Sequence, residues 1–250
     1  SRVAWSILER LGRFDGSSNL PCPISMNRKT ACEVYHRLLV QYPIINDRRH
    51  FLDFHNPYET LILTILSAQT TDRAVNAVRD ALFSRYPTPE ALARAKPEEV
   101  EPIIRTIGFH RTKARHIVET ARKLVSDFGG EVPRTMEELR TLPGVGRKTA
   151  NIVLSHAFGI NVGIAVDTHV RRLSKRIGFT ESTNPDIIER DLMALFPQEV
   201  WRDINYLLIR HGRAVCTAQN PKHDECVVAD LCRYYQELLA GEQVSCPEDR

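Results

Sequence analysis

The sequence predicts an all-α protein. Patterns typical of β-strands are nearly absent, whereas helix starts recur along the chain, separated by short connectors rich in glycine or proline. No long linker interrupts this series. The chain has 250 residues, 42% of them hydrophobic, which is enough for two modest domains with a substantial core. A disordered or fibrous protein is therefore excluded.

The expected helix starts share one pattern, in which an Asn or Thr precedes a proline or an acidic residue in the first turn. The capping residues are Asn56, Thr88, Thr135 and Asn184. After the first of them, the apolar run 61–68 continues as a largely buried helix. About ten helices are expected in total. Residues 1–27 and 239–250 lack such patterns and are expected to be a flexible extension and a flexible tail.

The charge of the chain is nearly balanced but unevenly distributed. Lys and Arg number 34 against 31 Asp and Glu, a formal net charge of +3. Residues 105–125 and 147–176 each carry six Lys or Arg and one acidic residue, which leaves the remainder of the chain negative. The two windows predict a surface that follows phosphates and an affinity for a polyanion that falls steeply with salt.

The six cysteines are placed unlike those of a disulfide scaffold. Cys216, Cys226 and Cys232 lie close together near the C-terminus, whereas Cys22, Cys32 and Cys246 are scattered. This pattern predicts a reducing compartment and a metal site. No apolar stretch is long enough for a membrane helix, and the first residues do not resemble a secretory signal. The bacterial cytoplasm is the simplest location, and an organellar or nuclear form is left open.

The most specific segment is 142–154, Leu-Pro-Gly-Val-Gly-Arg-Lys-Thr-Ala-Asn-Ile-Val-Leu. Gly144 and Gly146 form a turn between two expected helices, and glycine lets another backbone approach closely. The free amides at the start of the second helix suit an anionic oxygen. A Gly-x-Gly turn alone is often only a tight connector, but the complete string is much harder to explain in that way.

Lys148 lies in the first turn of that second helix, where the helix dipole and Arg147 favour a neutral, nucleophilic amine. Asp167 follows an apolar run and is expected to cap the next helix, which carries residues 170–176. A capping carboxylate with one oxygen directed into a cleft could also act in catalysis. A lysine nucleophile with a carboxylate is the combination that Schiff-base chemistry needs.

Four strings give the chain a resemblance to the endonuclease III family of helix-hairpin-helix DNA glycosylases. They are Ser-Ala-Gln-Thr-Thr-Asp at 67–72, the segment 142–151, Ala-Val-Asp-Thr-His at 165–169, and the C-terminal cysteine cluster. The similarity extends from about Cys32 to Leu238. It implies a two-domain helix-hairpin-helix glycosylase fold with a C-terminal metal-cluster loop. Residues 51–161 would form a six-helix barrel, and 28–50 plus 162–238 a second domain, with duplex DNA bound across the cleft.

The resemblance also implies the activity. A damaged pyrimidine would be flipped out of duplex DNA, Lys148 would attack the sugar, and β-elimination would cut the strand 3′ to the abasic site. Asp167 would take the lysine proton and stabilise the positive charge on the sugar. Two alternatives are retained: an adenine or mismatch glycosylase, which generally lacks this lysine, and a non-catalytic helix-hairpin-helix DNA-binding protein. A monomer is expected.

By their positions in the family's strings, further residues are expected to contact DNA. Gln69 resembles the side chain that fills the space left by the flipped base, and Phe109 occupies the position of a wedge. The alternatives are an ordinary polar residue at a helix end for Gln69 and a core residue for Phe109. The hairpin residues and one histidine complete the set expected at the DNA: Gly144, Gly146, Arg147, Thr149 and His169.

The C-terminal ligand pattern departs from the family at one position. The spacing is Cys216-x6-His223-x2-Cys226-x5-Cys232, whereas the family has cysteine at all four positions and holds a 4Fe-4S cluster. We expect a retained cluster with three cysteines and His223 as ligands. Zinc, for which this ligand set is ordinary, remains an alternative. A degenerate, empty site with Cys246 as a remote substitute is the other.

Overall fold

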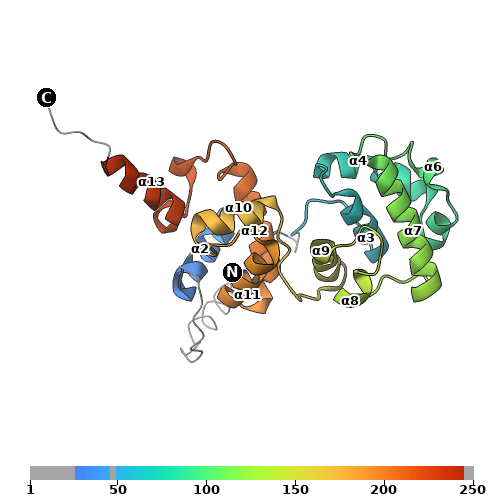
Figure 1. Ribbon diagram of the computed structural model, residues 1–250, viewed down its shortest axis with the longest axis horizontal. Helices are drawn as coiled ribbons and strands as arrows, with labels where there is room; N and C mark the ends of the chain where they lie inside the picture. Colours follow the sequence, from blue (N-terminus) through green and yellow to red (C-terminus); the bar gives the residue numbers. More distant parts are fainter. Residues whose placement is uncertain (1–25, 46–48, 245–250) are drawn as a thin grey trace. The chain divides into compact units, whose positions relative to one another are not determined.

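The computed structural model describes residues 26–45 and 49–244. Within these ranges the chain is helical and contains no β-strand, which confirms the all-α prediction (Figure 1). No helix in the same ranges has the length and the apolar character needed to cross a membrane. Residues 239–244 continue the last helix and are not the start of a flexible tail as expected. Most of the predicted N-terminal extension, together with Cys22 and Cys246, lies outside the described residues.

The chain divides into two compact units. One is Arg49–Ala165, and the other combines Ser1–Arg48 with Val166–Arg250. The sequence placed the limits of the first domain at 51 and 161, close to but not at these positions. We describe each unit by itself.

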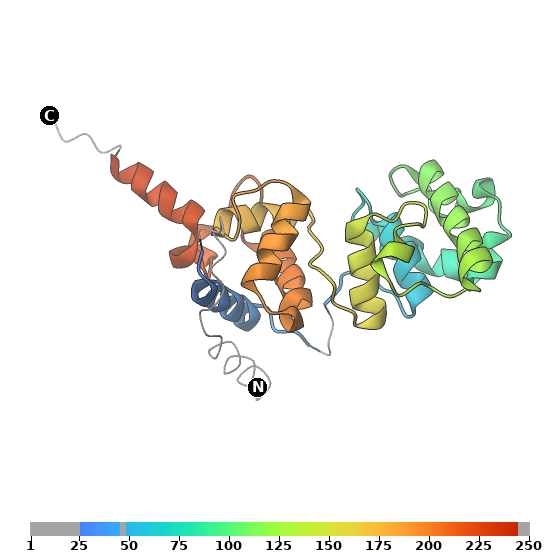
Figure 2. The ribbon, with the colours of Figure 1, turned by 60° about the horizontal axis from the view of Figure 1, so that its bottom comes forward.

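The unit 49–165 is built around helix α3, Pro57–Leu66. Every residue of α3 from Tyr58 to Leu66 is buried, so other elements enclose this helix on all sides. Three longer helices pack directly against it: α4 (Asp72–Arg85), α7 (His110–Phe128) and α9 (Arg147–Phe158). Figure 2 shows α9, in yellow, beside the blue α3.

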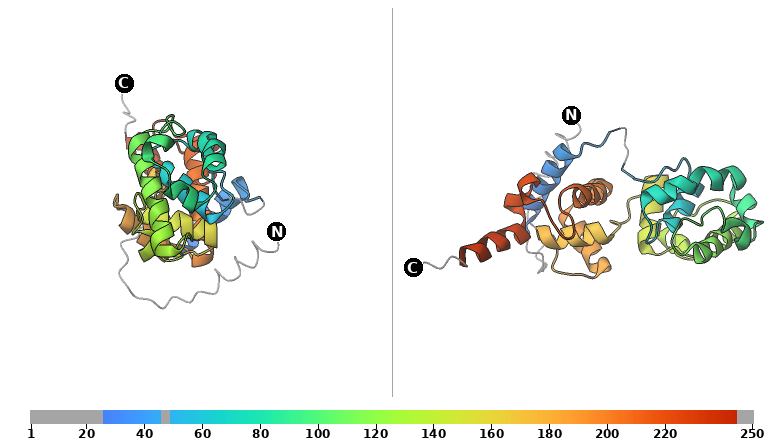
Figure 3. Two further views of the ribbon diagram at one scale, coloured as in Figure 1. Left: turned by 90° about the vertical axis from the view of Figure 1, so that its right-hand side faces the viewer. Right: turned by 90° about the horizontal axis from the view of Figure 1, so that it is seen from above.

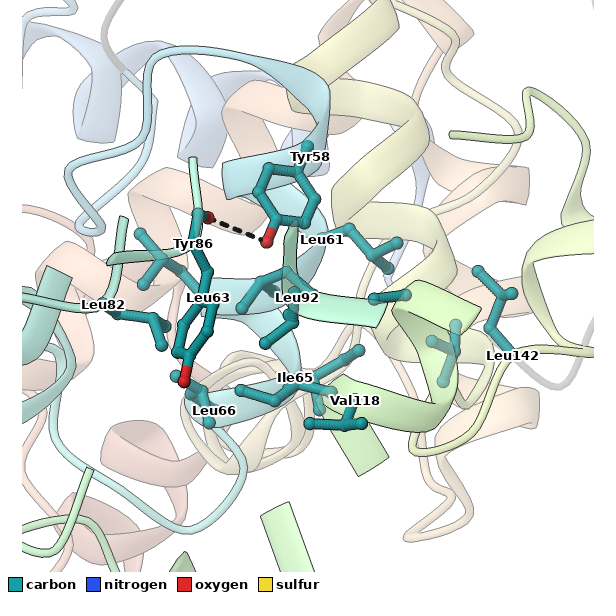
Figure 4. Packing of buried hydrophobic residues seen from close by; sticks show 14 of the residues in the cluster. Tyr58, Leu61, Leu63, Ile65, Leu66, Leu82, Tyr86, Leu92, Val118 and Leu142 are labelled. Carbon is teal, nitrogen blue, oxygen red and sulfur yellow. Dashed lines mark hydrogen bonds between the residues drawn. The ribbon is translucent and has the colours of Figure 1, made fainter. Parts of the chain in front are cut away.

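The core of this unit is formed by aliphatic side chains from α3 and the helices around it (Figure 4). Leu61, Leu63 and Leu66 have essentially no exposed surface, and burial of one such side chain contributes about 1.5 to 3 kcal/mol. At the edge of the core, the hydroxyl of Tyr58 donates to the backbone carbonyl of Tyr86 at 3.2 Å. The packed core gives the loops at the ends of these helices a rigid base.

The capping residues predicted from the sequence are confirmed. In each case the side chain accepts a hydrogen bond from a backbone amide in the first turn, at Asn56 (α3), Thr88 (α5, Pro89–Ala93), Thr135 (α8, Met136–Leu139) and Asn184 (α11, Pro185–Leu195). The described residues form twelve α-helices and three 3-10 helices, more than the ten expected. The excess consists of very short helices such as α6, Pro97–Val100, which are too short to show a periodic pattern.

The second unit joins segments from both ends of the chain. Helix α2, Arg28–Gln41, packs against α12, Trp201–Ala214, and the hydroxyl of Tyr35 donates to the buried carboxylate of Asp203 at 2.9 Å. Figure 3 shows α2, in blue, beside the orange and red C-terminal helices. Helix α10, Thr168–Ile177, packs on α12, and α13, Arg233–Val244, packs on α10.

Candidate functional site

The Gly-x-Gly turn lies between α8 and α9 and is anchored on both sides. Helix α8 ends at Leu139, earlier than the position near 142 expected from the sequence, and a hydrogen-bonded turn leads from there to Leu142. Leu142 and Val145 are buried in the core of the unit. The hydroxyl of Thr120 in α7 donates to the carbonyl of Pro143 at 2.9 Å. The turn is therefore a fixed part of the unit 49–165.

The two glycines of this turn differ in what they allow. Gly144 has φ +76°, and a Cβ atom there would lie 3.0 Å from Nδ1 of His116 and 3.2 Å from Cγ2 of Ile65. Any other residue at 144 would therefore be strained. Gly146, which caps α9, has an ordinary negative φ of −90°, and a Cβ atom there would meet nothing within 4 Å. The space beside Gly146 is open to an approaching group.

Lys148 is the second residue of α9, as predicted, and its side chain is exposed. The first turn of α9 contains no acidic residue and no side chain caps its amides. Among the described residues, the Lys148 amine forms neither a hydrogen bond nor an ion pair. Arg147 and Thr149 beside it are half-buried. The start of α9 therefore presents amides without a side-chain cap together with the exposed Lys148 amine, a positive site for an anionic ligand.

Asp167 caps α10, which confirms the helix start predicted there. Its Oδ1 accepts a hydrogen bond from the amide of Val170 at 2.8 Å. The other carboxylate oxygen accepts no hydrogen bond from the described chain. The side chain is half-buried, so that oxygen remains available for a second task.

His169 lies in the same helical turn and is held by its neighbours in the second unit. Its Nδ1 is 3.2 Å from Nη2 of Arg172, which can donate to it. Burial is the main cause of the lowered pKa of His169, and the charges of Arg172 and Arg213 lower this pKa further. The charge of Asp167 and a backbone hydrogen bond with Gly212 act in the opposite direction. The imidazole is therefore kept neutral and serves as an acceptor for Arg172.

Gln69 and Phe109 share an unusual backbone conformation. They are the two non-glycine residues with positive φ in the described chain, at 52° and 57°. Such a conformation costs a side-chain-bearing residue about 1 to 3 kcal/mol and persists where the surroundings impose it, often at functional sites. Both side chains are exposed, that of Phe109 by 68%, so Phe109 is not a core residue. A Cβ atom on the adjacent Gly108 would lie 3.8 Å from the Gln69 carbonyl oxygen, so the two loops run side by side.

Lys113 is a residue that sequence reasoning assigned only to a basic window. It is 5% exposed and its Nζ donates to the carbonyls of Leu66 and Ala68 and to Oγ1 of Thr70, at 2.9, 2.6 and 2.7 Å. Further along α7, Arg122 donates to the carbonyls of Ala93 and Ala95, both at 3.0 Å. The buried Lys113 of this window therefore binds backbone carbonyls and is not part of the phosphate-following surface that the charge pattern predicted, whereas Arg122 is exposed and also donates to carbonyls.

The C-terminal cysteines lie near one another and near α10. Cys216, Cys226 and Cys232 are free thiols. Burial raises the pKa of Cys226 to about 11, and the charges of Cys232 and Cys216 contribute to this increase. Nη1 of Arg176 lies 3.3 Å from Sγ of Cys216, and Arg172 donates to the Cys216 carbonyl. Three buried or half-buried thiols beside two guanidinium groups fit an anionic iron–sulfur cluster, whose iron would stabilise the thiolates that burial disfavours.

Two histidines of this segment, His223 and His211, make contacts with other side chains. The ring of His223 stacks on Tyr235 of α13, with centroids 4.5 Å apart and planes at 16°. By contrast, Nε2 of the buried His211 lies 3.4 Å from Sγ of Cys226, and its Nδ1 is 3.1 Å from the Tyr42 hydroxyl. No set of three metal-ligand side chains is arranged for a metal ion among the described residues.

Comparisons with known proteins give one family. The sequence pattern of the HhH-GPD superfamily of base excision DNA repair proteins matches residues 62–198. The pattern of the iron-sulfur binding domain of endonuclease III matches residues 216–232. Endonuclease III of Synechocystis sp. is 55% identical over 181 residues, covering 72% of this chain and 83% of the relative.

Solved structures are similar over nearly their whole length. A trapped endonuclease III–DNA covalent intermediate, an estranged-adenine complex, is 40% identical with a TM-score of 0.80, covering 86% of this chain and 99% of that chain. A thermostable thymine-DNA glycosylase is 28% identical with a TM-score of 0.73, covering 84% and 97%. Because a family pattern spans more than half of the sequence and a relative shares 55% identity, the chain belongs to the endonuclease III family of base excision DNA repair proteins.

Proposed function

We propose that this chain is a bifunctional DNA glycosylase and abasic-site lyase that removes oxidised pyrimidines from duplex DNA. The observation that carries the proposal is the exposed, unpaired amine of Lys148 at the open start of α9. A pure DNA-binding hairpin does not need a nucleophile there, and adenine glycosylases of this type generally lack one. The similarity to a trapped covalent endonuclease III–DNA complex supports the same chemistry.

The reaction assigns one role to each member of the catalytic pair. The Lys148 amine attacks C1′ of the flipped nucleotide, and the damaged base leaves with the electrons of its glycosidic bond. The C1′–O4′ bond of the sugar ring then opens, with its electrons and a proton going to O4′, and leaves a Schiff base at C1′. This Schiff base acidifies C2′, so that loss of a C2′ proton expels the 3′ phosphate. Asp167 takes the proton from the attacking amine and stabilises the positive charge that develops on the sugar. Its capping bond to Val170 leaves one oxygen for this task.

The loops of the unit 49–165 supply most of the contacts with DNA. The start of α9, with Gly144, Gly146, Arg147 and Thr149, binds a backbone phosphate at amides that no side chain caps. Gln69 fills the space left by the flipped base, and Phe109 stacks against a neighbouring base. His169, which is held by its hydrogen bond with Arg172, lies near Asp167 in the sequence and contacts the DNA strand that carries the flipped nucleotide. Affinity falls steeply with salt because released counterions drive the association.

The C-terminal segment holds a structural iron–sulfur cluster, with Cys216, Cys226, Cys232 and His223 as its ligands. This assignment rests on the matched iron-sulfur binding domain and on the shared surroundings of the three thiols. The cluster, of the 4Fe-4S type, supplies rigidity to the segment and takes no part in the reaction. A brown preparation that contains iron supports the assignment, whereas a colourless one with stoichiometric zinc contradicts it.

Free cysteines also agree with our assignment to the bacterial cytoplasm.

Borohydride trapping tests the proposed function directly. The purified protein is incubated with a panel of duplexes, each with one oxidised pyrimidine, abasic site or mismatch, in the presence of borohydride. We expect a covalent complex with oxidised pyrimidines and abasic sites, and loss of both trapping and strand cleavage in Lys148→Gln. Lys29→Gln, an exposed lysine of α2, serves as the matched control and retains both. Trapping by Lys148→Gln would overturn the assignment, and excision only at mismatches would favour the alternative glycosylase.

A further inference from the structure

The buried ammonium of Lys113 is attached to the loop that carries Gln69. Its bonds to Leu66, Ala68 and Thr70 use all three of its N–H groups. The acceptors belong to the last residue of α3 and to the connector before α4, directly on both sides of Gln69. Because the side chain is 5% exposed, this charge is not available to a phosphate. Its contacts are therefore entirely with the protein.

The three hydrogen bonds of the Lys113 ammonium compensate the free-energy cost of burying its charge. Burial lowers the pKa of Lys113, and an ammonium removed from water is stable only when its protons find acceptors. The carbonyls near the C-terminal end of α3 carry the negative end of the helix dipole and are suitable acceptors for a cation. The same bonds hold the connector 67–71 in a conformation in which Gln69 has φ 52°.

Lys113 also has hydrogen bonds to both loops that carry exposed side chains, the loop of Gln69 and the loop of Phe109. It lies in the first turn of α7, and its amide donates to the carbonyl of Phe109 at 3.0 Å. The main chain of Lys113 thus bonds to one strained residue, while its side chain bonds to both neighbours of the other.

We infer that Lys113 is a positioning residue, which holds the Gln69 loop in the conformation that inserts Gln69 into the duplex. The inference rests on the proposed function, in which Gln69 fills the space of the flipped base. Without the ammonium, the connector can relax to an ordinary negative φ at Gln69 and turn the side chain away. A displacement of about 1 Å at such a group can lower a rate on the order of a hundredfold.

A double-mutant cycle tests whether Lys113 acts through Gln69. The unsubstituted protein, Lys113→Met, Gln69→Ala and the double variant are compared in single-turnover excision of an oxidised pyrimidine from a duplex. A single-stranded abasic oligonucleotide provides the second measurement, because β-elimination there involves no partner strand and no space to fill. We expect Lys113→Met to lower duplex excision by about tenfold or more and to leave single-strand elimination unchanged. In the Gln69→Ala background, Lys113→Met should add almost nothing.

Arg122→Met is the matched control. It removes another cation of α7 that donates to two backbone carbonyls, but at a position away from Gln69. Arg122→Met should change duplex excision by the same factor in the unsubstituted protein and in the Gln69→Ala background. Thr70→Val removes one acceptor of Lys113, together with the bond from the Thr70 hydroxyl to the Ala68 carbonyl, so it tests the same loop contacts if Lys113→Met fails to fold. We expect a smaller loss of duplex excision that again disappears in Gln69→Ala.

The outcomes separate the inference from the proposed function. If Gln69→Ala excises from duplexes normally, the role proposed for Gln69 is wrong and the inference is overturned with it. If Gln69→Ala is impaired but the loss from Lys113→Met is additive, only the inference is overturned. Equal losses on duplex and single-stranded substrates from both Lys113→Met and Thr70→Val would also overturn it, since that result indicates general damage to the fold.

Discussion

One oxygen of the Asp167 carboxylate accepts a hydrogen bond from the amide of Val170 at 2.8 Å, and the other accepts none from the described chain. The residue therefore combines a structural task with a free oxygen. Because asparagine caps helices about as well as aspartate, Asp167→Asn separates the two tasks. We expect it to keep the stability of the protein and to lose most of the excision activity.

Asp167→Ala provides the comparison, since it removes the cap as well. It should lower the free energy of unfolding by a further ~1 kcal/mol relative to Asp167→Asn. Urea unfolding measures the stability, and single-turnover excision measures the activity. If Asp167→Asn excised bases at the normal rate, the carboxylate would have only its capping role.

The two glycines of the hairpin give opposite expectations. Gly144→Ala places a Cβ atom 3.0 Å from His116 at a positive φ, so we expect a loss of about 1 to 3 kcal/mol in unfolding free energy. Gly146→Ala adds its Cβ atom to open space and should leave stability nearly unchanged. Thermal unfolding distinguishes them.

The same pair tests the phosphate contact. If the open space beside Gly146 receives a phosphate, Gly146→Ala weakens DNA binding although the protein remains stable. Binding of a lesion-containing duplex, measured at one fixed salt concentration, checks this point. Normal affinity of a stable Gly146→Ala protein would remove Gly146 from the proposed site.

Local signals in the sequence were sufficient for much of the fold. Asn56 and Asp167 were identified as caps because a cap and its helix lie within a few adjacent residues, where the pattern can be read directly. The position of Lys148 in the first turn of α9 followed in the same way from the turn before it. These features depend on neighbours in the sequence, and tertiary packing changes them little.

Other features required the tertiary structure. The bond from Lys113 to Leu66 joins residues 47 positions apart, and a lysine in a basic stretch carries no sign of burial. The positive φ of Gln69 has no local signal either, because glutamine does not favour it. His223 was expected to be a ligand from its place in the family's cysteine pattern, and that pattern gives no sign of its stacking on Tyr235, which depends on where α13 packs.

Phe109 combines a strained backbone with an exposed aromatic ring, which predicts different effects on stability and on binding. Phe109→Gly relieves the positive φ and should raise the unfolding free energy by about 1 kcal/mol. Phe109→Ala retains the strain and should change stability little, because the ring is 68% exposed.

Both substitutions remove the ring that stacks in the proposed complex. Each should therefore weaken binding to a lesion-containing duplex by about 1 to 3 kcal/mol, the usual range for a base stacked on an aromatic side chain. Unfolding and binding are measured on the same preparations. A large loss of stability in Phe109→Ala would show that the ring packs in the protein instead.

The role of His223 is tested by two replacements with opposite effects on the ligand set. His223→Cys restores the cysteine that the family has at this position, so it should retain iron and a brown colour. His223→Ala leaves three thiols and should contain less iron per chain and release it faster to a chelator. Iron content equal to that of the unsubstituted protein in His223→Ala would show that the ring stays on Tyr235 and does not ligate the cluster.

His169 predicts a dependence of stability on pH. Its folded-state pKa is lowered, mainly by burial and further by Arg172 and Arg213, with Asp167 opposing, whereas the unfolded chain has the ordinary value of about 6.5. Above about pH 6.5, histidine is neutral in both states and its titration does not affect stability. As the pH falls below this value, the unfolded chain binds a proton that the folded His169 resists, so stability decreases.

Replacement of this histidine isolates its contribution. His169→Gln can still accept from Arg172 but does not titrate, so it should lose less unfolding free energy than the unsubstituted protein between about pH 7.5 and about pH 5.5. His211, whose pKa burial lowers to about 4, is present in both proteins and cancels in the comparison. Urea unfolding at the two pH values measures the difference. Identical pH dependence in the two proteins would mean that His169 is accessible to protons in the folded state, and the bond to Arg172 would not hold it neutral.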